Sequence, residues 1–263
     1  MSYRYNYTWR RNSISGPMRL VAASDIFHPT SDQKYGLGMK YELNDGTGRI
    51  FRYAEDGGAG LSKATMAQSL AAVANWTEQA MTSYTAAVGD QTVQITLATA
   101  VAANDLDDGW LCVTDGAPAG SLGDMYLIKS HTTGTTPVLT LADIGGIRTA
   151  LATTSEVTVI PNQYKDVVGV PAAAATAIPC GVPLVDVTAG YFGWLQTRGP
   201  CPLIIDTDDV VVGNPVGETT TANVIGGGGL VANDGTGPVW GWVMAESTSG
   251  QADQPSIVYL TLE

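Results

Sequence analysis

Residues 36–58 read GLGMKYELNDGTGRIFRYAEDGG. The Asn-Asp-Gly in the middle supplies the positive φ that a hairpin connection needs, and strand-forming residues flank it on both sides. We therefore predict a strand over 39–43, a turn, and a strand over 49–53. The pentapeptide Asn-Asp-Gly-Thr-Gly recurs at 233–237, ahead of a predicted strand over 239–245, so a second hairpin loop is predicted there.

Short apolar runs separated by turn residues continue along the chain, and most are rich in Val, Thr, Ile and aromatic residues. This pattern predicts an all-β fold, either an antiparallel β-sandwich, of which a jelly roll is one form, or a barrel. A parallel α/β fold would need recurring crossover helices, which the sequence lacks. Residues 61–82 are the best helix candidate, although their apolar positions form no clean stripe. Further strands are predicted at 92–96, 110–114, 125–130, 138–141, 156–160, 166–170, 184–187, 191–196, 203–205, 210–212 and 256–262.

The predicted organisation is an extended N-terminal arm over residues 1–30 followed by a β-rich body over 31–263. A boundary between two lobes could fall at 172–183, where Ala, Pro and Gly form a connector. The glycine-rich stretch 222–229 marks a long loop. Neither connector has the polar composition of an inter-domain linker, so one continuous body is expected.

The composition is low in charge, with 14% charged residues and a net charge of −12. Soluble globular chains carry roughly 25% charged residues, so a helix-covered intracellular enzyme fits poorly. No run approaches the roughly 18 to 20 apolar residues that span a bilayer, so no membrane partner is predicted. The N-terminus lacks the apolar block of a secretory signal, which predicts synthesis and use on the cytosolic side.

The charge is divided along the chain. Residues 1–52 hold eight basic and four acidic side chains, a net of +4, and the rest hold five basic and 21 acidic, a net of −16. The first 20 residues combine arginine with alternating aromatics and contain little aliphatic material for a core. Arginine and aromatic residues anchor protein interfaces, so we interpret this segment as a protein-docking arm. A nucleic-acid arm and an arm folded back on its own subunit are the alternatives, and the acidic body argues against nucleic acid.

The candidate catalytic and metal-binding residues form no recognised motif. His28 and His131 lie in separate loops, and no nucleophile elbow, phosphate-binding loop or dinucleotide fingerprint is present. Three cysteines, Cys112, Cys180 and Cys201, fit neither a disulfide framework nor a metal site, so reduced and mostly buried thiols are predicted.

Two acidic groups are weak calcium candidates. Asp105, Asp107 and Asp108 precede a glycine, and the second group is Asp206, Asp208 and Asp209. Alternating carboxylates can wrap Ca²⁺, but the spacing fails the EF-hand pattern. Solvated turns are the favoured interpretation, and no metal or cofactor is predicted.

Two tryptophans follow strand alternation in VWGWVMAE. Trp240 and Trp242 are predicted to share one face of a strand, because side chains two residues apart point the same way. Core packing or a subunit contact is favoured over a carbohydrate-stacking face.

The segments LGMKYELNDGTGRIFRYAEDGGAGLSKATMAQ, GWLCVTDGAPAGSLGDMYLIKSH, LATTSEVTVIPNQYKDVVG and AGYFGWLQTRGPCPLIID resemble structural proteins of tailed-bacteriophage heads, in the same order, over about residues 36–215. The resemblance implies a non-enzymatic capsid decoration or cement protein that binds the outside of the major capsid shell. The implied partners are the major capsid protein and two further copies of the chain in a trimer, and the implied location is the virion exterior. The capsid-docking hypothesis names Tyr3, Arg4, Tyr5, Tyr7, Trp9, Arg10, Arg11, Arg19, Lys40, Arg49 and Arg52.

The sequence is compatible with two other functions. A head-fibre or tail-associated protein that binds a receptor or carbohydrate would use the exposed aromatic residues for stacking. A polysaccharide hydrolase would need a carboxylate pair such as Asp107 or Asp108 with Asp209. Nothing in the sequence indicates that the members of this pair approach each other.

Overall fold

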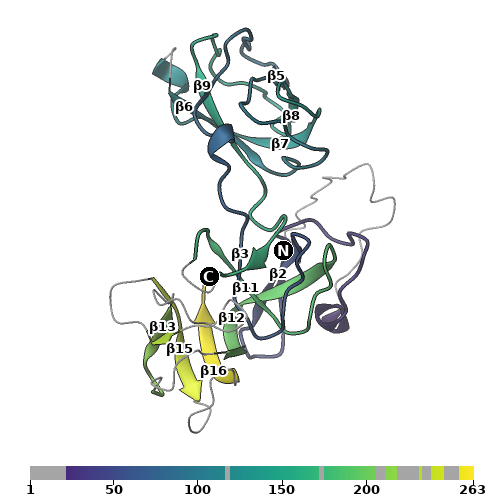
Figure 1. The fold of residues 1–263 in the computed structure, drawn as a ribbon, viewed down its shortest axis with the longest axis vertical. Helices are drawn as coiled ribbons and strands as arrows, with labels where there is room; N and C mark the ends of the chain where they lie inside the picture. The colour runs from purple at the N-terminus through teal and green to yellow at the C-terminus, as the bar shows by residue number, and fades with distance from the viewer. Residues whose placement is uncertain are drawn as a thin grey trace, which may run out of the picture.

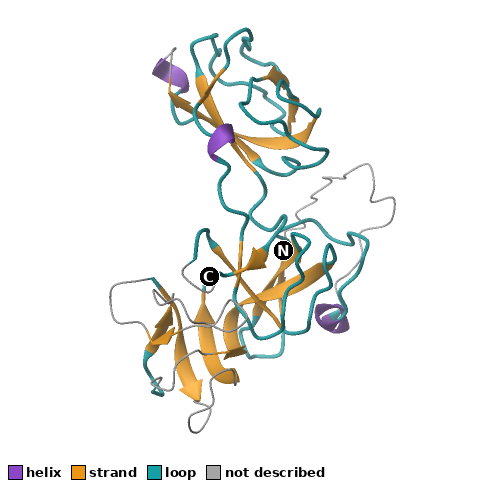
Figure 2. Cartoon of the chain, viewed as in Figure 1, coloured by secondary structure: helices purple, strands orange, loops and turns teal. Residues whose placement is uncertain are grey.

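The computed structural model describes residues 22–115, 119–171, 175–204, 211–217, 231–232, 238–245 and 255–263. Within these ranges the fold is all-β, with three short 3₁₀ helices and two curled antiparallel sheets that form half-barrels (Figure 2). The predicted all-β class is therefore confirmed. The 3₁₀ helices are η1 (Ala23–Phe27), η2 (Ala74–Trp76) and η3 (Ala119–Ser121).

The chain forms two lobes joined by two adjacent chain segments (Figure 1). The insert lobe comprises the described residues of 70–163, and the base lobe comprises those of 22–69 and 164–263. Each lobe has its own sheet, and the buried clusters divide in the same way: one cluster draws on residues 73–159 alone, and three clusters draw on residues outside 70–163. The base lobe is thus built from both ends of the chain around an inserted lobe.

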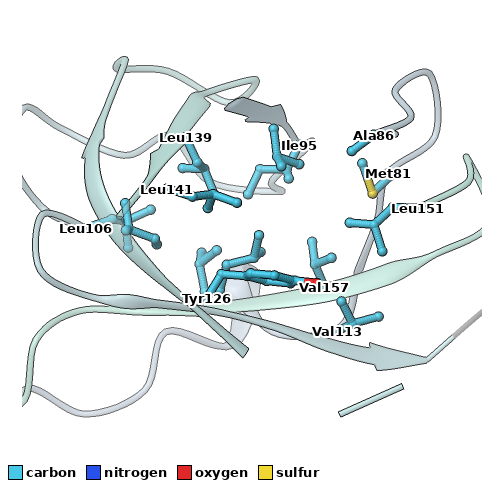
Figure 3. Packing of buried hydrophobic residues seen from close by; sticks show 14 of the residues in the cluster. Met81, Ala86, Ile95, Leu106, Val113, Tyr126, Leu139, Leu141, Leu151 and Val157 are labelled. Carbon is cyan, nitrogen blue, oxygen red and sulfur yellow. The ribbon is translucent and has the colours of Figure 1, made fainter. Parts of the chain in front are cut away.

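The insert lobe has a six-stranded antiparallel sheet in the order β4-β9-β6-β7-β8-β5. Its strands alternate between a buried and an outer face, and the inward side chains close around Tyr126, Ile95 and Leu139, which are fully buried (Figure 3). The strands are β4 (Gln79–Ala80), β5 (Thr92–Gln94), β6 (Trp110–Asp115), β7 (Met125–His131), β8 (Val138–Leu141) and β9 (Glu156–Ile160).

The base lobe has a ten-stranded sheet in which β12 is the longest strand and lies at the centre. The first part of β12 pairs with β2 and β11, and its second part pairs with β16. A register shift between Gln196 and Arg198 separates the two parts and bends the sheet. The strands are β1 (Lys40–Glu42), β2 (Ile50–Glu55), β3 (Ala67–Gln68), β10 (Val168–Gly169), β11 (Pro179–Pro183), β12 (Phe192–Ile204), β13 (Pro215–Gly217), β14 (Val231–Ala232), β15 (Val239–Ala245) and β16 (Pro255–Thr261).

The first hairpin matches the prediction. Strands β1 and β2 pair in antiparallel register with Lys40 opposite Arg52, and Gly46 and Gly48 take positive φ of 76° and 68° in the loop. The Asp45 carboxylate accepts a hydrogen bond from the Thr47 backbone at 3.0 Å and another from the Thr47 hydroxyl. The bonds from Thr47 lower the pKa of Asp45 to about 2. The second copy of the pentapeptide, 233–237, lies outside the described residues.

The helix predicted over 61–82 is wrong. The segment instead contains β3, η2 and β4, and Ala64, Glu78 and Thr82 take positive φ between 50° and 61°, which a right-handed helix does not allow. The segment crosses from the base lobe to the insert lobe, so its apolar side chains are distributed between two cores: Met66 is buried in one and Trp76 in the other.

The connector at 172–183 does not coincide with the division between the lobes. Within it, Pro179–Pro183 forms β11, which pairs with β3 on one side and β12 on the other. The two cores divide instead near 70–73 and 161–163. The strand predicted at 184–187 is reduced to an isolated bridge between Val187 and Leu61, and the strand predicted at 210–212 is absent from its described residues, 211–212.

The three cysteines are free, with Cys180 and Cys201 buried and Cys112 partly exposed. Burial raises the pKa of the Cys180 and Cys201 thiols to about 12, so both are protonated at neutral pH. The expectation of reduced and mostly buried thiols is confirmed.

Candidate docking surfaces

The N-terminal docking residues Tyr3, Arg4, Tyr5, Tyr7, Trp9, Arg10, Arg11 and Arg19 lie outside the described residues. Residues 22–30, which the sequence assigned to the arm, are attached to the base lobe. Ile26 of η1 is buried with Phe192, and Thr30 and Phe192 exchange two backbone hydrogen bonds of 2.9 Å. The arm proper is therefore at most residues 1–21.

The basic residues of the hairpin are each paired with an acid. Lys40 lies 3.6 Å from Glu42, and Arg49 lies 3.2 Å from Asp45. Arg52 makes a bidentate pair with Glu263, through bonds of 2.7 and 2.9 Å, and also donates to the Gly38 carbonyl at 2.8 Å. The structure brings Lys40 and Arg52 together across β1 and β2 and leaves Arg49 in the loop. Acidic partners within the hairpin and at Glu263 thus already balance these positive charges, which weakens the case for the hairpin as a free cationic surface.

The Arg52–Glu263 pair predicts a pH dependence of stability. Its hydrogen bonds to Arg52 lower the pKa of Glu263, so the stabilisation is present above the ordinary value of 4.5 and is lost as the pH falls through the lowered value. The pair is partly exposed, so Glu263→Gln should reduce the free energy of unfolding by at most about 1 kcal/mol at pH 7, and by progressively less as the pH falls below 4.5. Urea unfolding at pH 7 and at acidic pH measures this, with Lys40→Gln as control because its more exposed pair should contribute less. An equal loss at both pH values would contradict the prediction.

The carboxylates proposed for calcium serve separate local roles. Asp105 accepts a hydrogen bond from the Ala102 amide at 2.7 Å, and Asp107 is buried 3.8 Å from His131 Nε2. His131 has a structural role, because Nε2 accepts the Leu106 amide proton at 3.1 Å while Nδ1 lies 2.9 Å from the Thr132 carbonyl. Among the described residues, no three His, Cys, Asp or Glu side chains are placed to hold a metal ion. The group Asp206, Asp208 and Asp209 lies outside those residues.

An apolar patch lies on part of the outer side of the insert lobe sheet. Two cross-strand rows run over β9, β6 and β7: Ile160, Trp110 and Leu127 form one, and Thr158, Cys112 and Met125 form the other. Cross-strand partners project from the same side of a sheet, so the six side chains form one patch, which we call the insert face. Trp110, Met125 and Ile160 are 39%, 44% and 38% exposed, and none of the six side chains carries a formal charge at neutral pH.

A second apolar surface covers the outer side of the base lobe sheet. The pairing of four strands places Pro200, Tyr259, Trp242 and Pro215 in one cross-strand row, and Pro202 and Ile257 lie side by side in the next. We call these six residues the base face. Trp242 and Ile257 are each 47% exposed, and Pro202 is exposed as well.

The two tryptophans of β15 lie on opposite faces, so the predicted shared face is wrong. Val216 pairs with Gly241 and Gly217 with Val239, which leaves Trp240 as the extra residue of a bulge. A bulge shifts the alternation of side chains by one position. Trp240 is therefore buried in the core, whereas Trp242 opens onto the base face.

The insert face was not identified from the sequence, and of the base face only Trp242 was, as one of two tryptophans predicted to pack in the core or form a subunit contact. The signal is present, because β6 and β16 read WLCVTD and PSIVYLT, with apolar residues at both odd and even positions. A strand with one solvated face alternates apolar and polar residues, so apolar residues at both odd and even positions predict an apolar outer face.

No family model, curated protein or solved structure matches the chain. In the part of the chain that the structure describes, no helix is long and apolar enough to span a membrane.

Proposed function

We propose that this chain is a non-enzymatic virion structural protein, a capsid decoration protein that binds the outside of the major capsid shell and stabilises it. The observation that carries the proposal is the insert face, a cluster of exposed apolar side chains at the centre of a rigid sheet. The resemblance to phage head proteins supplies the kind of partner. The same resemblance supplies the location proposed for the protein, the capsid exterior.

The insert face has the composition of a protein interface. Tryptophan and methionine are enriched at interface centres, and charged residues are depleted there. The three most exposed residues, Trp110, Met125 and Ile160, lie on three adjacent strands, so no loop has to become ordered when a partner binds. A preorganised surface loses little conformational entropy on binding, which favours a permanent attachment.

Binding to empty shells of the major capsid protein tests the proposal. The double variant Trp110→Ala, Met125→Ser should bind at least about 100-fold more weakly, because each anchor contributes on the order of tenfold or more. Ile144→Ser is the matched control, since Ile144 is 89% exposed on a loop of the same lobe and should bind as the unaltered protein does. Unchanged affinity of the double variant would overturn docking by this face. A failure of the unaltered protein to bind shells would overturn the function.

A head-fibre or tail-associated protein that binds a receptor or carbohydrate is the second candidate. The adjacent Trp242 and Tyr259 side chains favour it, because neighbouring aromatic rings on a sheet provide a stacking surface. Mass-spectrometric copy number separates the two candidates. A decoration protein should be present in numbers comparable to the major capsid protein, and a fibre or tail component should be present in far fewer copies.

A further inference from the structure

The base face is an apolar surface that the described part of the chain leaves open. The same four strands bury Cys201, Leu203, Trp240 and Val258 on their inner side, so this part of the sheet is apolar on both sides. Single exposed apolar residues are ordinary, but a contiguous row across four strands marks a site that a partner covers.

We propose that the base face binds the N-terminal arm of a second copy of this chain, through the aromatic residues Tyr3, Tyr5, Tyr7 and Trp9. These four residues alternate with Arg4, Asn6 and Thr8 in the sequence. On an extended backbone, alternate side chains point the same way, so the four rings would share one side. An aromatic side of this kind matches a flat surface of Pro, Trp, Tyr and Ile.

Charge favours the same pairing. The first 20 residues contain four arginines and no acid, whereas residues 53–263 carry a net charge of −16. The arm is therefore basic and the remainder of the chain is acidic, so long-range electrostatic attraction favours contact between them.

The position of the arm favours a second copy over the arm's own subunit. The described chain begins at Ala22, directly before η1, and Ile26 of η1 is buried in one cluster with Phe192 at the start of β12. Pro202 of the base face lies ten residues further along β12, at most about 33 Å at the rise of an extended strand. Residues 10–21 can span at most about 40 Å, so an arm that returned to its own base face would use most of its length on the approach, whereas a neighbouring copy can bring its face to the arm.

The proposal goes beyond capsid binding, and its test needs no capsid. Sedimentation velocity of the full chain should show a concentration-dependent oligomer. Two variants should each be monomeric: deletion of residues 2–20, and the face variant Trp242→Ser, Ile257→Ser. Each should raise the dissociation constant at least about 100-fold, by the same estimate of about tenfold per anchor. Ile144→Ser, outside both faces, should assemble normally, and thermal unfolding checks that every variant is folded.

Mixing the two variants gives the decisive result. The arm-deleted chain keeps its base face and the face variant keeps its arm, so an equimolar mixture should form a heterodimer although neither variant associates alone. An arm-deleted chain that still self-associates would overturn the proposal, because association would then not need the arm. A monomeric full chain would also overturn it. Either result leaves shell binding through the insert face unaffected, since that experiment has a separate readout.

Discussion

Replacing Asp56 with alanine is expected to lower the free energy of unfolding of the base lobe by about 3 kcal/mol. Asp56 follows β2, is 3% exposed, and accepts hydrogen bonds at Oδ2 from the amides of Gly58, Gly60 and Gly190 at 2.7, 3.1 and 2.8 Å. Each bond to a charged acceptor contributes about 1.5 kcal/mol or more. The other oxygen, Oδ1, is buried without a hydrogen-bond partner, so removing it recovers about 1 to 2 kcal/mol and the net loss remains large.

Urea unfolding measures the loss, with Asp186→Ala as the matched control. Asp186 accepts a single amide hydrogen bond, from Lys63 at 2.8 Å, and is exposed, so its removal should cost at most about 1 kcal/mol. Asp56→Asn should fall between the two, because it keeps one oxygen acceptor. Equal losses for Asp56→Ala and Asp186→Ala would show that the three glycine amides do not depend on the buried carboxylate.

The variant Leu111→Ala should lower the stability of the insert lobe by about 3 kcal/mol and leave the base lobe unchanged. Leu111 is fully buried in the core of residues 73–159, and leucine-to-alanine changes in such cores cost about 2 to 5 kcal/mol. The two lobes have separate sheets and separate buried clusters, so each should unfold in a transition of its own. Differential scanning calorimetry should resolve two unfolding transitions, and Leu111→Ala should lower the midpoint temperature of only one of them.

Leu203→Ala is the reciprocal variant. Leu203 is equally buried, in the base lobe, and its replacement should move the other transition. A single transition that both variants shift by similar amounts would contradict the prediction, because it would show that the lobes unfold as one cooperative unit.

Local features of the fold could be predicted from the sequence, and long-range features could not. The β1–β2 hairpin depends on a turn within 23 residues, and its Asn-Asp-Gly is sufficient to predict it. The inserted arrangement of the lobes depends on the pairing of β3 with β10, about 100 residues further along the chain, for which no local pattern exists. The bulge at Trp240 likewise depends on the strand opposite it, so strand alternation within β15 alone placed both tryptophans on one face.

The candidate site shows the same limit. Arginine and aromatic content predicts a docking arm, whose residues lie outside the described ones, and charge alone singled out the basic residues of the hairpin. The partner that neutralises Arg52 is Glu263, 211 residues away, so only the fold could show that this charge is already paired. The insert face depends on the register of β6 with β7 and β9, and the base face on the registers of β12, β15 and β16 with one another. The sequence of a single strand does not determine its register with its neighbours.

The chain leaves the base lobe and returns to it at paired residues, since Gln68 and Val168 are Cα partners in β3 and β10. For the base lobe, everything between them acts as the loop of a hairpin. The entropy of closing a flexible loop grows only with the logarithm of its length, so shortening about 100 residues to about 10 changes the closure term by only about 2 kcal/mol. When the insert is folded and its two ends lie close together, the base lobe does not have to close a flexible loop, so this entropy cost is absent. At the connection between β3 and β10, the base lobe can therefore accept a different folded domain in place of the insert lobe without a change in its own strands.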